Sequence, residues 1–167
     1  MTSPGLADDL AALQAATFAS SPLATATSYP PSRRLTGASL LAALTSPRYY
    51  ATVSTTRADG RPHAAPSAFV LSGLEVWLPT VAGAVRLRNV RANPYAVAVV
   101  ADGVHATHLA VIAEGPCRIV DALPEAVEPD VVAKLERVPD WVGAWIVLSP
   151  SRLLSYAAED AGYETGA

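Results

Sequence analysis

The sequence of 167 residues holds one cysteine, one lysine and few charged side chains of any kind. Because a disulfide needs two thiols, Cys117 alone excludes an internal disulfide framework and any multi-cysteine metal site. Twelve basic residues face fifteen acidic ones, so the net charge is −3. A surface that tracks phosphates normally shows a basic excess, so this balance argues against nucleic acid as the main partner.

Long apolar runs are also missing. The stretch from Trp141 to Leu148 is among the longest, and a membrane span needs roughly 18–20 residues. The N-terminal stretch carries two aspartates and no basic residue before Arg33, which does not fit a secretory signal. We therefore expect a soluble cytoplasmic protein with no membrane partner.

Several catalytic motifs are absent as well. No glycine-rich phosphate loop joins a strand to a helix, and there is no Gly-x-Ser-x-Gly elbow. His105 and His108 are three residues apart in a predicted strand, so their side chains point to opposite faces and a shared metal is not expected. Glu114 could lie at the mouth of a barrel, but its neighbours assign it no role. The sequence thus predicts no metal site and identifies no catalytic residue.

What is present is a high apolar content. Hydrophobic residues make up 51% of the chain and charged residues 16%, which is enough apolar material for one folded domain with a sizeable core. Ser3-Pro4 predicts the start of an amphipathic helix, and Ser20 to Arg34 is rich in Ser, Thr and Pro. We expect residues 1–34 to form an appended segment that lies on the domain, packs on a partner subunit or is a flexible tail. Residues 35–167 would then form the domain.

Within that domain the pattern is mainly that of strands. Thr36 is typical of a helix cap, and a short helix is expected after it at 38–44. Asp59-Gly60 predicts a hairpin turn. Further helices are expected at 83–91 and at 124–138, the second interrupted by Pro129. Short turns between the remaining segments favour a mainly β (α+β) fold, a small antiparallel barrel with Greek-key or meander pairing and a few short flanking helices. Six strands are predicted, at residues 49–56, 61–71, 74–80, 95–101, 105–120 and 143–158, with Gly115-Pro116 as a bulge or corner and Ser149-Pro150 midway in the last strand.

The strand 61–71 is the most informative segment. Arg61, His63, Ala65 and Ser67 share one face, because side chains alternate along a strand. The prolines at 62 and 66 lack the backbone N–H group, which predicts a strand at the edge of the sheet. The small residues would let a flat ligand lie close to the backbone.

Three arginines follow on the predicted helix 83–91. Arg86 and Arg91 are five residues apart and Arg88 lies on another face, so the three cannot form one stripe. One or two of them could hold a compact anion such as phosphate near the helix start, where backbone N–H groups converge. The alternative is that all three lie on a solvated helix face.

Four segments in this order (residues 51–55, 59–66, 76–80 and 86–94) resemble the pyridoxamine 5′-phosphate oxidase-like family of flavin-binding split β-barrels. The resemblance covers about residues 36–158. It implies a six-stranded antiparallel split β-barrel that forms a homodimer and binds a flavin-type cofactor at the subunit interface. The resemblance places Arg86 at the cofactor phosphate and the strand from His63 to Ser67 along the ring and ribityl chain. The cofactor-binding residues that it implies are His63, Ala65, Pro66, Ser67, Leu78, Pro79, Thr80, Arg86 and Arg88, with Arg88-Asn89 equally suited to packing the helix.

The sequence also departs from the family pattern. The family often has a Ser and a second basic residue just before the phosphate-binding position, where this chain has Ala84 and Val85. Either backbone amides with Arg91 or Arg61 compensate, or the cofactor binds weakly, or the site has lost its ligand. The segment after Val120 lacks the Arg and His signature for the substrate of true pyridoxamine 5′-phosphate oxidases, so that specific activity is not expected.

The resemblance implies an oxidoreductase that moves a hydride between the cofactor and a small organic substrate. FMN is the first expectation and an 8-hydroxy-5-deazaflavin coenzyme the alternative, because an arginine-rich groove would suit the carboxylates of a deazaflavin tail. Another class of function stays open: a non-catalytic flavin- or haem-binding barrel, or a dimer with a degenerate cofactor site or a purely structural role.

Overall fold

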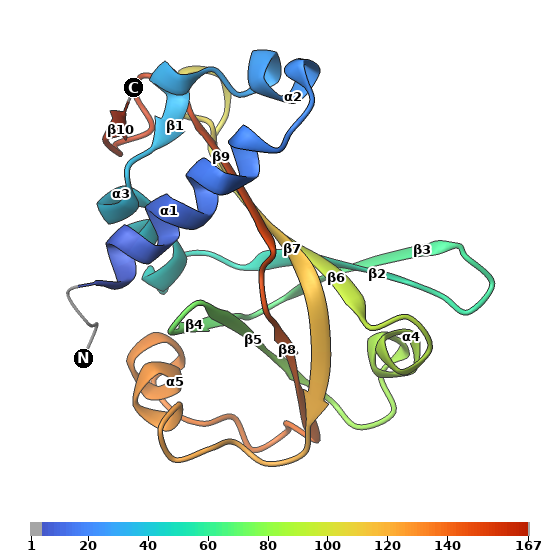
Figure 1. Ribbon diagram of the computed structural model, residues 1–167. Helices are drawn as coiled ribbons and strands as arrows, with labels where there is room; N and C mark the ends of the chain where they lie inside the picture. Colours follow the sequence, from blue (N-terminus) through green and yellow to red (C-terminus); the bar gives the residue numbers. More distant parts are fainter. Residues whose placement is uncertain (1–4, 167) are drawn as a thin grey trace.

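The computed structural model describes residues 5–166, and a largely antiparallel sheet dominates it (Figure 1). Seven strands follow one another in the order β3-β2-β6-β7-β8-β5-β4, and β9 pairs with β7 beside this path. The expected mainly β architecture with few helices is therefore confirmed, and the sheet is split rather than closed. The strands of the sheet are β2 (Ala51–Thr56), β3 (Pro62–Ser67), β4 (Val70–Ser72), β5 (Glu75–Thr80), β6 (Tyr95–Asp102), β7 (Leu109–Val120), β8 (Ala144–Leu148) and β9 (Arg152–Ala157).

Two of the six predicted strands each divide into two. The segment 61–71 breaks at Ala68-Phe69 into β3, which pairs with β2, and β4, which pairs with β5. The segment 143–158 breaks at 149–151 into β8 and β9. Both pieces run along β7, because Leu148 pairs with Cys117 and Arg152 pairs with Glu114. The long strand β7 thus connects the two halves of the split sheet.

The break at 149–151 lies opposite Gly115 of β7, where the sequence predicts a bulge or corner. A Cβ atom at Gly115 would lie 2.3 Å from the carbonyl oxygen of Ser149 and 2.7 Å from the nitrogen of Ser151. Only glycine therefore lets the chain approach β7 this closely. Upstream, the predicted strand 105–120 is too long: residues 105–107 form the short 3-10 helix η2, and His105 adopts a φ of 51° that no strand residue has.

Five α-helices flank the sheet within residues 5–166. The hydroxyl of Thr36 accepts a hydrogen bond from the backbone N–H of Ser39, so the predicted cap of the helix is confirmed. Pro129 does not interrupt its helix but lies in the first turn, where the missing N–H group costs no hydrogen bond. The helices are α1 (Leu6–Ala19), α2 (Leu23–Ser28), α3 (Gly37–Thr45), α4 (Val85–Ala92) and α5 (Glu128–Leu135).

The N-terminal helix α1 packs on α3 and β9. Leu6 and Leu10 join the main buried cluster together with residues of the sheet, and Gln14 donates a hydrogen bond of 2.9 Å to the carbonyl oxygen of Leu35. The predicted helix start at Ser3-Pro4 lies outside the described residues. The Ser-, Thr- and Pro-rich stretch that follows folds into α2, the 3-10 helix η1 (Pro31–Arg33) and β1 (Arg34–Leu35), and β1 pairs with β10 (Thr165–Gly166).

Two buried clusters hold the fold together. The larger one lies between the sheet, α1, α3 and α4, and the smaller one joins Trp77 and Trp145 to Val127 and Val131 at α5. In Figure 1 the β2–β3 hairpin projects to one side with α4 next to it, whereas α1, α3 and α5 lie on the other side. No helix within residues 5–166 combines the length and the apolar character that crossing a membrane requires.

Candidate functional site

The first part of the candidate site is one face of the β2–β3 hairpin. His63, Ala65 and Ser67 alternate with the exposed residues of β3 and become more buried along the strand. They lie directly across from Thr55, Val53 and Ala51 of β2, all of which are buried. β3 pairs with no strand other than β2 among residues 5–166, so the edge position that its two prolines predict is confirmed.

Helix α4 is fixed to this hairpin by two asparagine side chains. The amide of Asn89 donates a hydrogen bond of 2.9 Å to the hydroxyl of Thr55. The amide of Asn93, just after the helix, donates to the carbonyl oxygens of Thr56 and Arg57, at 3.2 and 3.1 Å. Because Thr55 is the cross-strand partner of His63, these bonds hold α4 beside the end of the hairpin that carries His63.

Three side chains in this region carry buried polar atoms without a partner. Nδ1 of His63, Oγ of Ser67 and Nη1 of Arg86 are shielded from solvent and make no hydrogen bond within residues 5–166. Unpaired buried polar atoms are rare in folded proteins, because each one loses its bonds to water without replacement. The only other such atom among the described residues, Nε1 of Trp77, belongs to the smaller cluster near α5.

Arg86 lies one helical turn before Asn89, on the first turn of α4. Its guanidinium is half-buried and forms no ion pair with any carboxylate of residues 5–166. Burial lowers the pKa of Arg86, because the charged form loses hydration. An anion beside this guanidinium would restore the missing counter-charge.

The start of α4 offers further hydrogen-bond donors. Ala84 is the N-cap residue, so no side chain caps the helix, and its first turn contains no acidic residue. In this first turn the N–H group of Leu87 donates to the carbonyl oxygen of Ala84, which leaves the N–H groups of Val85 and Arg86 to bind an anion. This end of the helix therefore suits a negatively charged group next to Arg86.

The end of β5 leads into this helix start. Leu78, Pro79 and Thr80 are all buried, and the side chain of Leu78 lies in the main core. The hydroxyl of Thr80 donates a hydrogen bond of 3.1 Å to the carbonyl oxygen of Leu78, and its own carbonyl accepts one of 3.0 Å from Gly143. These three residues therefore fix the end of β5, from which residues 81–84 continue to α4.

Other residues that the sequence singles out lie elsewhere. Pro66 is on the exposed face of β3, and Arg88 and Arg91 are exposed on α4. Arg61 forms an ion pair of 2.8 Å with Asp59 in the hairpin turn. Glu114 pairs with Arg152 of β9 at 2.8 Å. Among the arginines that the sequence offers for a phosphate, Arg86 therefore remains the candidate at the start of α4.

Sequence reasoning did not single out Thr55, although this residue links the hairpin to α4. Its signal was the alternation of strand 51–56, which places Thr55 on the same face as Val53. Lys134 was missed as well: the sole lysine of the chain is buried at α5, far in sequence from the predicted site.

Solved structures with the same fold include proteins of different kinds. A conserved hypothetical protein from Mycobacterium tuberculosis matches with a TM-score of 0.67 and 20% identity, over 83% of this chain and 95% of that one. An F420 reductase matches with a TM-score of 0.54 and 21% identity, over 67% and 93%. HutZ, described as a heme storage protein from Vibrio cholerae, matches with a TM-score of 0.50 and 13% identity, over 68% and 90%. At these identities the likeness concerns the fold.

A comparison of the sequence with curated proteins found no match. The sequence profile described as pyridoxamine 5′-phosphate oxidase, in contrast, matches residues 40–163, a range that runs from α3 to the segment before β10 and contains the hairpin, β5 and α4. Together with the split antiparallel sheet, this match shows that the chain belongs to the pyridoxamine 5′-phosphate oxidase family.

Proposed function

We propose that this protein is an oxidoreductase that uses a flavin-type cofactor, bound between the β2–β3 hairpin and the start of α4. The observation that carries the proposal is the set of unpaired buried atoms on His63, Ser67 and Arg86. All three residues belong to the set that the family resemblance implies for cofactor binding. Polar atoms that find no partner within residues 5–166 are expected where a ligand supplies the partner.

The residues present fit such a cofactor. Arg86 and the uncapped N-terminus of α4 would hold its phosphate, since both offer donors and neither has an acidic neighbour in the first turn. Ala65, between His63 and Ser67, would allow the ring system to lie close to the β3 backbone. The bound cofactor would supply the hydride transfer.

In this proposal the protein binds, orients and shields. Ser67 and His63 would fix the ring by hydrogen bonds, and the buried residues Leu78, Pro79 and Thr80 would keep the strand next to the site rigid. The hairpin face is only half covered within one chain, so a homodimer would complete the site with a second subunit. No side chain of this region is an evident general acid or base, and we assign no catalytic residue.

FMN is the proposed cofactor, and an 8-hydroxy-5-deazaflavin coenzyme is the alternative. A single phosphate near Arg86 would satisfy the half-buried guanidinium, whose Nη1 has no partner within residues 5–166. A longer tail with several carboxylates would instead use the exposed Arg88 and Arg91 as well. The structural likeness to an F420 reductase favours keeping the second cofactor in the experiment.

A second candidate function is non-catalytic binding of a flavin or of haem. Ala84 and Val85 favour it, because they supply neither the hydroxyl nor the second positive charge that the family often has before the phosphate position. The likeness to a heme storage protein points in the same direction.

Titration of the purified apoprotein with FMN, the deazaflavin and haem tests the proposal, with visible spectra and flavin fluorescence as readouts. We expect micromolar or tighter binding of FMN, followed by turnover of a reduced nicotinamide or a quinone. Binding without turnover supports the second candidate, and failure of both flavins to bind contradicts the oxidoreductase.

The Arg86→Ala variant tests the phosphate contact directly. Loss of a charge-assisted hydrogen bond should weaken FMN binding by roughly 1.5–3 kcal/mol. Arg91→Ala, an exposed arginine in the last turn of the same helix, is the matched control and should bind FMN like the parent. Light scattering of the parent protein should give the mass of a dimer.

A further inference from the structure

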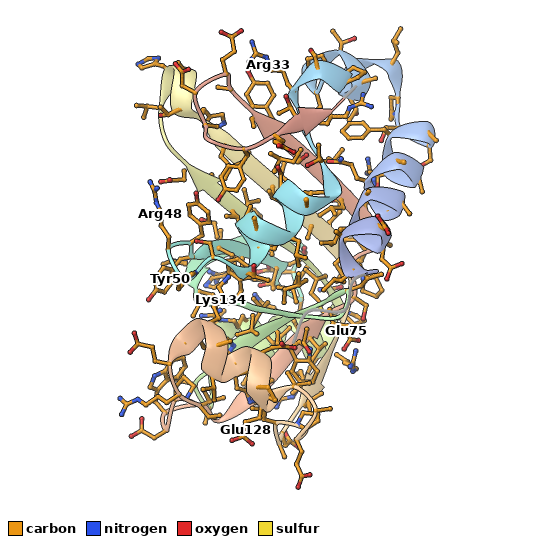
Figure 2. The ribbon with its side chains drawn as sticks, turned by 90° about the vertical axis from the view of Figure 1, so that its left-hand side faces the viewer. Arg33, Arg48, Tyr50, Glu75, Glu128 and Lys134 are labelled. Carbon is orange, nitrogen blue, oxygen red and sulfur yellow. The ribbon has the colours of Figure 1, made fainter. Side chains whose placement is uncertain are left out.

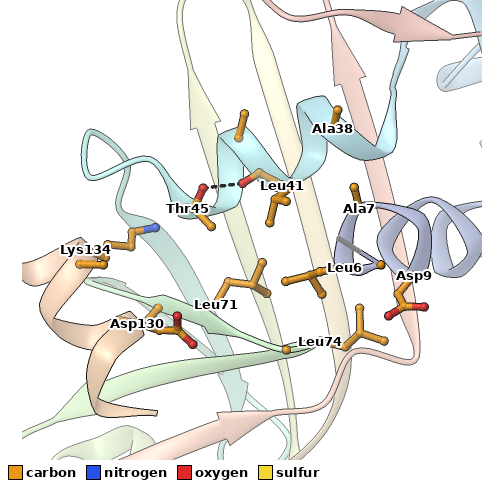
Figure 3. A pocket seen from close by; sticks show the side chains of 15 residues that line it. Leu6, Ala7, Asp9, Ala38, Leu41, Thr45, Leu71, Leu74, Asp130 and Lys134 are labelled. Carbon is orange, nitrogen blue, oxygen red and sulfur yellow. Dashed lines mark hydrogen bonds between the residues drawn. The ribbon is translucent and has the colours of Figure 1, made fainter. Parts of the chain in front are cut away.

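A second region of interest lies where α1, α3 and α5 meet. A cavity of about 730 Å³ opens between α1, α3, α5 and β4 (Figure 3). Its size falls in the usual range for small-molecule sites, roughly 300–1,000 Å³. None of the residues proposed to bind the flavin-type cofactor lines it. Most of the wall is apolar, formed by leucine, alanine and valine side chains, of which Leu6, Leu41, Leu71 and Leu74 are the largest.

One wall of this cavity carries the only lysine of the chain. Lys134 is 7% exposed, and its Nζ donates a hydrogen bond of 2.7 Å to the carbonyl oxygen of Leu44. The same nitrogen lies 3.2 Å from the centre of the Phe69 ring. Figure 2 shows Lys134 above α5, between this helix and the upper part of the molecule.

Lys134 has no counter-ion within residues 5–166, where the ion pairs involve arginine only. Two carboxylates line the cavity with it. Asp130, one turn earlier on α5, forms no ion pair with Lys134 and accepts a hydrogen bond of 2.7 Å from the hydroxyl of Ser72. Asp9 is exposed, and Figure 3 shows it at the far end of the cavity from Lys134, beyond the leucines.

A buried ammonium group without a counter-ion is unfavourable, because it has lost its hydration. Burial accordingly lowers the pKa of Lys134 to about 7. A ligand anion placed against Nζ would supply the missing charge, and the leucine-lined space requires the remainder of that ligand to be apolar. The carboxylates of Asp130 and Asp9 disfavour a ligand with several negative charges.

We propose that this cavity binds a small apolar carboxylate, such as a medium-chain fatty acid, whose carboxyl group pairs with Lys134. The chain of the ligand lies along Leu71, Leu41 and Leu6. This site is separate from the proposed cofactor site and does not depend on it.

The single lysine makes the test unambiguous. Protein labelled with ¹³C at lysine Cε gives one lysine signal, which is titrated with pH in the presence of octanoate or of octanol. Octanoate should bind and move the pKa of Lys134 upward from about 7, because the bound carboxylate stabilises the ammonium form. Octanol, which has the same chain without the charge, should leave that pKa unchanged. Equal affinity for the two ligands, or an unmoved lysine signal, overturns the proposal.

Two variants, with a third as control, separate the charge from the cavity. Lys134→Met should weaken octanoate binding by roughly tenfold or more and leave octanol binding within about twofold. Ala42→Phe fills the cavity from an exposed position of α3 and should abolish binding of both ligands, whereas Ala15→Phe on the exposed side of α1 should change neither. Retention of octanoate by Ala42→Phe would place the ligand elsewhere and overturn the proposal.

The same samples distinguish this site from the cofactor site. FMN should not shift the lysine signal, and Arg86→Ala should bind octanoate like the parent. Failure of octanoate to bind while FMN binds would refute the cavity proposal alone. Failure of FMN with normal octanoate binding would refute the proposed function alone.

Discussion

The side-chain amide of Asn89 donates a hydrogen bond of 2.9 Å to the hydroxyl of Thr55, and both residues are buried. This contact joins two segments 34 residues apart and holds α4 beside the β2–β3 hairpin. The proposed phosphate ligand Arg86 depends on it, because Arg86 lies one turn before Asn89 on the same helix.

Replacing Asn89 by alanine should therefore destabilise the protein by about 1–3 kcal/mol, since the hydroxyl of Thr55 loses its buried partner. Urea unfolding of Asn89→Ala, Thr55→Val and the double variant measures the interaction energy between the two residues. The double variant should lose less than the sum of the two single ones. Strict additivity would contradict a direct contact.

A hydroxyl at the start of α4 should strengthen the helix and the proposed phosphate site. Ala84→Ser adds a side chain that can cap the helix, worth about 1 kcal/mol of stability. One added net hydrogen bond to a phosphate would tighten FMN binding by roughly fivefold, as measured by fluorescence titration. Ala92→Ser at the exposed end of the same helix is the control. If Ala84→Ser stabilises the protein but leaves the affinity for FMN unchanged, the phosphate does not bind at this helix start.

The buried amine of Lys134 should make stability depend on pH. Its pKa is about 7 in the folded protein and 10.5 in the unfolded chain, so between these values the unfolded state binds the extra proton. The free energy of unfolding should therefore rise with pH from about 7 to about 10.5. Below pH 7 the amine is protonated in both states, and this group adds no slope.

The Lys134→Met variant isolates this contribution. It should be more stable than the parent at pH 7, and the difference should shrink with rising pH by at most about 1.4 kcal/mol per pH unit. Urea unfolding of both proteins across this range checks the slope. Parallel stability curves would show that Lys134 is hydrated in the folded protein.

Gly115 should tolerate no side chain. A methyl group there would lie 2.3 Å from the carbonyl oxygen of Ser149 and 2.7 Å from the nitrogen of Ser151. Both are backbone atoms, which cannot move independently of the chain. Gly115→Ala should lower the free energy of unfolding by about 3 kcal/mol or more. Gly166→Ala, whose new methyl group would meet only a side-chain carbon at 3.4 Å, is the matched control in thermal unfolding. A stable Gly115→Ala variant would require β8 and β9 to lie farther from β7.

Local patterns were enough to predict much of the sheet. The aromatic and β-branched residues of 49–56 identify β2, and Asp59-Gly60 identifies the turn that leads to β3. Pro62 and Pro66 identify the edge, because a missing backbone donor is a property of the residue itself. The cap at Thr36 is local in the same sense.

Features that depend on distant contacts could not be predicted. The breaks at Ala68-Phe69 and at 149–151 arise because each segment changes its pairing partner, which no short pattern records. The burial of Lys134 depends on Leu44, 90 residues earlier in the chain. The cavity likewise needs α1, α3 and α5 to meet. For the candidate site, the residues of β3 and α4 follow from resemblance, whereas their unpaired atoms are visible only in three dimensions.

The prolines of β3 also limit how two molecules can associate. Pro62 and Pro66 are four residues apart in β3, so their backbone nitrogens point to the same, outer side of the strand. Between them only Ala64 offers a backbone N–H group on that side. A strand from another chain cannot form a ladder on such an edge, which protects the projecting hairpin from edge-to-edge aggregation. In the proposed homodimer, a second subunit would therefore approach the hairpin through its side-chain faces, which include the one bearing His63, Ala65 and Ser67.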